Sequence, residues 1–83
     1  MKVYSISSPE KLRDITEGIK WDRDYRAAMA FADKWDGARE AYTVTLEFGK
    51  SAIIMVDDGA SKKPLATMYT AAARDSVKEL IEI

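Results

Sequence analysis

One pair of adjacent carboxylates, in Asp57-Asp58-Gly59, could hold a cation in this 83-residue sequence. Mg²⁺ and Ca²⁺ bind carboxylate oxygens, but a calcium loop of the EF-hand type needs further oxygen ligands at fixed offsets and a closing glutamate. None of these follows Gly59. We therefore expect a strand end followed by a turn, and a divalent-metal-dependent enzyme is the weakest of three hypotheses for this chain.

Gly49-Lys50-Ser51 has the sequence of the end of a phosphate-binding loop. The complete motif carries another glycine five residues before the first of these and is followed by a helix. Val44 occupies that position, and the flanking sequences on both sides are typical of strands. We interpret Gly49 as part of a hairpin turn instead.

Residues 20–26 interleave cations with Trp21 and Tyr25, as segments that hold phosphates and stack on bases do. Two aspartates in the same segment partly neutralise those cations and stand at the spacing of helix ion pairs. We favour a solvated, ion-paired helix face. The alternative is a nucleic-acid-associated module that contacts phosphates through Lys20, Arg23, Arg26, Lys62 and Lys63.

The sequence contains no histidine, cysteine, asparagine or glutamine. His and Cys carry most general-base, nucleophilic and transition-metal chemistry near neutral pH, and Asn and Gln make the bidentate contacts that read adenine. The balance of 13 Lys and Arg against 14 Asp and Glu lacks the basic excess typical of nucleic-acid binders. We therefore expect no enzymatic activity, no cofactor and no metal site, and recognition of a partner by shape and apolar surface.

The length of the chain predicts one domain, residues 1–83. The content of 47% hydrophobic and 33% charged residues is typical of a globular protein. Without cysteine there is no disulfide, and no apolar run approaches the roughly 20 residues that cross a bilayer. We expect a cytoplasmic protein that does not act at a membrane.

Hydrophobic periodicity predicts the elements of the first half. Alternation over residues 2–6 indicates a strand. Ser7 stands three residues before Glu10, the spacing of a capping box, and predicts a short helix from about Pro9. A longer helix ends at Asp36-Gly37. It carries a stripe that we expect in the core, formed by Trp21, Tyr25, Ala28, Ala32 and Trp35.

In the second half the period changes to two, which predicts a hairpin over residues 42–57 with a two-residue turn at Gly49-Lys50. That turn pairs Leu46 with Ile53 and Val44 with Met55. The second face of the hairpin then carries Thr43, Thr45, Ile54 and Val56.

The sequence after the hairpin is less clearly patterned. Residues 57–64 indicate a loop, and residues 65–70 fit either a strand or the start of the last helix. We favour the strand, with Thr70 capping a helix over residues 71–82.

Together these elements predict an α+β fold in the order β-α-α-β-β-(β)-α. A small, mostly antiparallel sheet of three or four strands packs against three helices that lie largely on one side. An apolar second face would be a docking or dimer surface if neither the first nor the last helix covers it.

We therefore favour a small non-enzymatic protein-binding module. It would be a regulator or inhibitor that occludes a surface of a larger protein assembly, as accessory proteins of phages and mobile elements do. The predicted partner is another protein or protein complex, and a homodimer is the alternative. Since Trp and Arg dominate binding hot spots, the candidate contact residues are Trp21, Arg23, Arg26, Ile54, Val56 and Met68.

Overall fold

The computed structural model describes residues 2–19, 22–78 and 80–83. Its elements are β1 (Lys2–Ile6), α1 (Pro9–Thr16), α2 (Asp22–Asp36), a 3-10 helix η1 (Arg39–Ala41), β2 (Thr43–Phe48), β3 (Ala52–Asp57), β4 (Lys62–Met68), α3 (Thr70–Ser76) and β5 (Ile81–Glu82). The α+β class and the order of the elements are as predicted from the sequence, and β5 is an addition to them.

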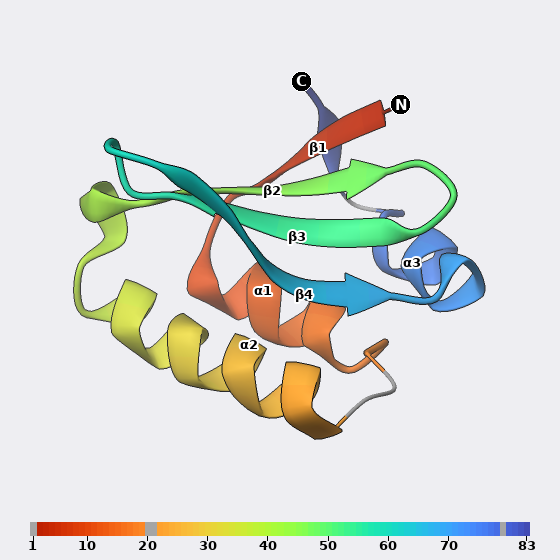
Figure 1. Cartoon of the computed structure of the whole chain (residues 1–83), viewed down its shortest axis with the longest axis horizontal. Helices are drawn as coiled ribbons and strands as arrows, with labels where there is room; N and C mark the ends of the chain where they lie inside the picture. Colours follow the sequence, from red (N-terminus) through yellow and green to blue (C-terminus); the bar gives the residue numbers. More distant parts are fainter. Residues whose placement is uncertain (1, 20–21, 79) are drawn as a thin grey trace.

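The five strands form one antiparallel sheet in the order β4-β3-β2-β1-β5. The three α-helices lie on one side of this sheet (Figure 1). The core fills the space between the two layers, and α1 packs on both α2 and α3. Its buried members are Ile6, Leu12, Ile15, Ile19, Ala28, Ala32, Trp35, Val44, Leu46, Ala52, Ile54, Ala66, Met68 and Ala73.

α1 begins at Pro9, as predicted, but its N-cap lies one residue later than the capping-box spacing predicts. Ser8 is the N-cap, and its hydroxyl accepts a hydrogen bond from the Lys11 N–H at 3.1 Å. Pro9 then takes the first helical position, where its fixed φ fits and its missing N–H is not needed. The prediction that Ser7 caps this helix is therefore wrong.

The stripe of α2 is only partly in the core. Ala28, Ala32 and Trp35 are buried, and the Trp35 indole N–H donates to the Arg39 carbonyl at 3.1 Å. Tyr25, by contrast, is 42% exposed, so its predicted place in the core is wrong. The prediction for Trp21 lies outside the described residues.

The hairpin register differs by one residue from the predicted one. Phe48 pairs with Ala52, Leu46 with Ile54 and Val44 with Val56, because three residues rather than two connect the strands. The Gly49 N–H closes this turn on the Ser51 carbonyl at 2.9 Å. A shift of one residue moves every side chain of a strand to the opposite face, so Ile54 and Val56 lie on the helix side.

The chain after the hairpin also differs from the prediction at its boundaries. The last three residues of the predicted polar loop, Lys62, Lys63 and Pro64, belong to β4. Tyr69, not Thr70, occupies the N-cap position of α3. This helix ends at Ser76, whereas the sequence pattern continues it to residue 82. The segment Ile81–Glu82 instead pairs with β1 as β5.

Candidate functional site

The side of the sheet opposite the helices is crossed by two rows of paired residues. One row runs through Ile83, Val3, Glu47, Ile53 and Thr67, and the other through Ile81, Ser5, Thr45, Met55 and Pro64. We call these two rows the open face. No helix of the described residues packs on it, since all three lie on the other side of the sheet (Figure 1).

The open face carries an apolar surface that is most exposed at its β5 end. Ile81 is 78% exposed and Ile83 is 74% exposed. Val3, Ile53 and Met55 are half-buried, and none of the three belongs to the helix-side core. Ser5, Thr45 and Glu47 lie between these apolar side chains. Because the face gathers several apolar residues that no described helix covers, it is the strongest candidate for contact with a partner.

One ion pair crosses the other end of this face. The Lys62 ammonium on β4 reaches over β3 and contacts the Glu47 carboxylate on β2. The two charged groups form an ion pair, but their contact does not have the geometry of a hydrogen bond. Lys side chains keep their charged head near water while the stem lies along apolar surface. The β3–β4 end of the open face is therefore more polar than the β1–β5 end.

The two edges of the sheet also differ. At the β4 edge, lysines and Pro64 occupy the strand, the register shifts between Ile54 and Met55, and the Asp24 carboxylate of α2 accepts the Thr67 N–H at 3.4 Å. Lysine, proline and bulges at an edge hinder pairing with another chain. The β5 edge is formed by two residues without a lysine or proline.

The structure places the predicted contact residues on different parts of the molecule. Ile54 and Met68 are 0% and 1% exposed beneath the helices, and Val56 packs against the same core, so the folded chain does not offer these side chains to a partner. Arg23 and Arg26 are exposed on α2, in the other layer of the fold. Trp21 lies outside the described residues.

The cations predicted to contact phosphate do not converge in one place. The Asp24–Thr67 contact sets the first turns of α2, with Arg23 and Arg26, beside the last residues of β4. Lys62 and Lys63 stand at the first residues of that strand. Five residues of extended chain separate the two ends by roughly 15 Å. Lys20 lies outside the described residues.

The Asp57-Asp58-Gly59 segment is a hydrogen-bonded turn, as interpreted from the sequence. Asp57 accepts the Gly59 N–H at 2.8 Å, and Asp58 accepts those of Ala60 and Ser61, both at 2.9 Å. The backbone donors of Ser61 and Ala60 lower the pKa of Asp58. Gly59 takes a φ of +92°, which suits a residue without a Cβ. Within residues 2–19, 22–78 and 80–83, no three carboxylates gather as a metal site.

Ion pairs connect the helices on the solvent side of their layer. The Arg13 guanidinium contacts Asp33 at 2.9 Å, and Arg39 contacts both Glu10 and Asp36 at 2.6 Å. The hydrogen bond from Arg39 lowers the pKa of Glu10, and the bonds to Glu10 and Asp36 raise the pKa of Arg39. Because their charged groups are largely exposed, these pairs add little to stability.

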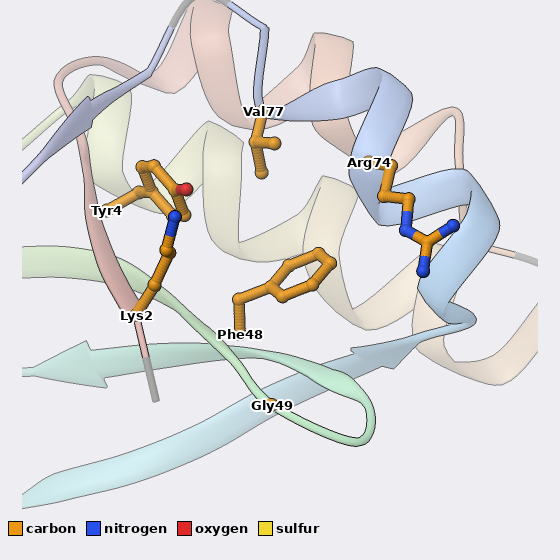
Figure 2. Close-up of a pocket in the computed structure, with 6 residues that line it drawn as sticks. All are labelled: Lys2, Tyr4, Phe48, Gly49, Arg74 and Val77. Carbon is orange, nitrogen blue, oxygen red and sulfur yellow. The ribbon is translucent and has the colours of Figure 1, made fainter.

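A groove of about 390 Å³ opens on the helix side of the sheet, between the β1–β2 end and α3. Tyr4, Phe48 and Val77 form its apolar part, and Gly49 borders it. Figure 2 shows Lys2 and Arg74 on opposite sides of Phe48. Sequence reasoning did not single out these residues, because they come from three separate elements.

Comparison with known proteins returns no similarity: no family model, curated protein or solved structure matches this chain. In the described part of the chain, no helix combines the length and the apolar character needed to cross a bilayer.

The exposed isoleucines of β5 were also missed from the sequence. Their signal was present as the alternation Ile81-Glu82-Ile83, which has the period of a strand. The helical spacing of Ala73, Val77 and Leu80 instead led to the prediction that the helix continues through this segment.

Proposed function

We propose that this chain is a protein-binding module that contacts another protein through the open face and performs no catalysis. The observation that carries the proposal is the uncovered side of the sheet with Ile81 and Ile83 each about three-quarters exposed at one end. A partner that covers this surface would remove apolar area from water, which is the main favourable term in protein association. By occupying a surface of that partner, the module would act as a regulator or inhibitor.

The proposed occupant is a different protein rather than a second copy. A self-complementary dimer needs to bury about 1,200 Å² or more. The exposed apolar end of this face is narrow, because β5 has two residues and the ion pair of Lys62 with Glu47 occupies the other end. A larger partner can follow the whole face, including its polar end, without matching the face to itself.

Site-specific photocrosslinking in the cells that encode the chain tests this proposal. A photoreactive phenylalanine at position 83 probes the open face, and the same residue in place of Ala30, which is exposed on α2, is the control. We expect one defined adduct with another protein from position 83 and none from position 30. An adduct between two copies, or the same adducts from both positions, would overturn the assignment.

A variant pair then tests which surface carries the affinity for the crosslinked protein. Ile81→Asp with Ile83→Asp places charge on the open face, and Tyr25→Asp does so at an exposed residue of α2. We expect the double variant to weaken the complex by about a hundredfold or more, since two apolar contacts are lost and two carboxylates must be desolvated. Equal affinities of the two variants would remove the open face from consideration.

A further inference from the structure

We propose that the groove between β1, β2 and α3 is a binding site for a small organic anion, such as a monocarboxylate with an apolar body. The inference is independent of the open face, because Tyr4 and Phe48 lie on the helix side of the sheet. Both pack against the core there, and Tyr4 is paired with the buried Leu46.

The size and lining of the groove indicate an apolar body of modest length. Its volume of about 390 Å³ lies within the range of small-molecule sites, near the lower end. Tyr4, Phe48 and Val77 are all only partly buried by the protein itself, so each retains surface that a ligand could cover. The Phe48 ring lies between Lys2 and Tyr4 on one side and Arg74 on the other (Figure 2).

The charges at the groove indicate that the ligand is an anion. Lys2 and Arg74 border it from β1 and α3, and among the described residues no carboxylate belongs to its lining. In the part of the chain that the structure describes, neither cation contacts a carboxylate, whereas Arg13, Arg39 and Lys62 each do. A carboxylate bound at the Arg74 side or the Lys2 side of the groove would be held by that cation through charge-assisted hydrogen bonds, which are stronger than neutral ones.

Both properties are needed together, which separates this site from a simple anion site. Inorganic phosphate or acetate would satisfy the cations but leave Phe48 and Val77 uncovered. A neutral alcohol would cover the apolar residues but leave Lys2 and Arg74 without a counter-charge. The ligand class is therefore amphipathic, with one acidic group and one short chain or ring.

Titration of the full chain with sodium octanoate, followed by two-dimensional amide NMR, tests the proposal. We expect saturable shifts at Tyr4, Phe48, Gly49, Arg74 and Val77 below the concentrations at which octanoate forms micelles. Octylammonium, octan-1-ol and acetate should each bind about tenfold more weakly or not at all, because one charge-assisted contact corresponds to at least that factor.

Two charge-reversal variants provide the matched comparison. Arg74→Glu should weaken octanoate binding by about tenfold or more, whereas Arg26→Glu on α2 should leave it unchanged. Both positions are exposed, so both variants should keep the amide spectrum of a folded chain. The proposal is overturned if octanoate gives no saturable shift, if octylammonium shifts the same residues equally, or if Arg74→Glu binds octanoate as the unaltered chain does.

Discussion

The hydroxyl of Ser8 is the side chain that fixes where α1 begins. It accepts the Lys11 N–H, one of the helix donors that have no intrahelical partner. Ser7 precedes it and is exposed. Two neighbouring serines therefore make different contributions, although either could form the first position of a capping motif.

Replacing each serine by alanine separates them. Ser8→Ala should lower the free energy of unfolding by about 0.5–2 kcal/mol, because the cap hydrogen bond is lost. Ser7→Ala should change it by less than about 0.5 kcal/mol. Urea denaturation followed by circular dichroism measures both values. A larger loss for Ser7→Ala would mean that the helix begins one residue earlier in solution.

Asp58 gives the turn after β3 a dependence on pH. Its pKa is lowered in the folded chain by the Ser61 and Ala60 N–H groups, so the folded state binds this proton more weakly than the unfolded state. The stabilisation is complete above the unfolded-state pKa of about 4 and is lost as the pH falls through the lower folded-state value. Asp58→Asn keeps an acceptor oxygen without the charge. We expect the stability difference between the two chains to shrink between about pH 5 and pH 2 in urea denaturation, and a difference independent of pH would contradict this.

At the scale of the elements, the sequence predicts which segments form strands and helices better than it predicts how they pair. Every position from Ala52 to Val56 is apolar, so either register of the β2–β3 hairpin places apolar side chains on both faces. The alternation of apolar and polar residues that normally selects a register is therefore absent from β3, and the pattern does not distinguish the two registers. The turn decided it, and Gly49-Lys50 favours two residues whereas the chain uses three.

The observed register makes a direct prediction about β3. Ile54→Ala should cost about 2–5 kcal/mol of stability, because Ile54 is completely buried beneath the helices. Ile53→Ala should cost about 1 kcal/mol, since a half-buried side chain contributes roughly half of the transfer free energy. Thermal and urea denaturation of the two variants measure the difference. A larger loss of stability for Ile53→Ala than for Ile54→Ala would instead support the register of the two-residue turn.

The last strand could not be predicted from local sequence for a related reason. Val77 and Leu80 continue a helical spacing, but the backbone of β1 needs a partner on its outer side, and Ile81–Glu82 supplies it. Pairing between the two ends of a chain is a tertiary effect that overrides local propensity. The candidate site was missed with it, because Ile81 and Ile83 reach the open face only through this pairing.

At the scale of the whole molecule, the arrangement of helices on one side of the sheet agrees with the prediction from the sequence. It leaves one face and two edges of the sheet toward solvent. The two edges differ in the residues that hinder pairing with another strand. Lys63 and Pro64 make the β4 edge a poor template for another strand.

Removing that protection should increase self-association. We expect Lys63→Val with Pro64→Val to lower the soluble fraction over days and to raise thioflavin T fluorescence, because the edge gains a backbone donor and loses a charge. Lys78→Val removes a charge from an exposed position after α3 and is the control. Equal behaviour of the two variants would show that this edge does not govern association.

The short β5 has a consequence for motion. Its pairing with β1 joins positions separated by almost the whole chain, and two residues give few bonds to offset that loop closure. We expect this strand to detach in local openings that leave β2, β3 and α2 intact. In hydrogen–deuterium exchange, the Ile83 amide should exchange quickly, whereas that of Leu46 should wait for global unfolding. A ligand that holds β5 in place would slow the first rate without changing the second, which makes exchange at the end of the chain a reporter of occupancy.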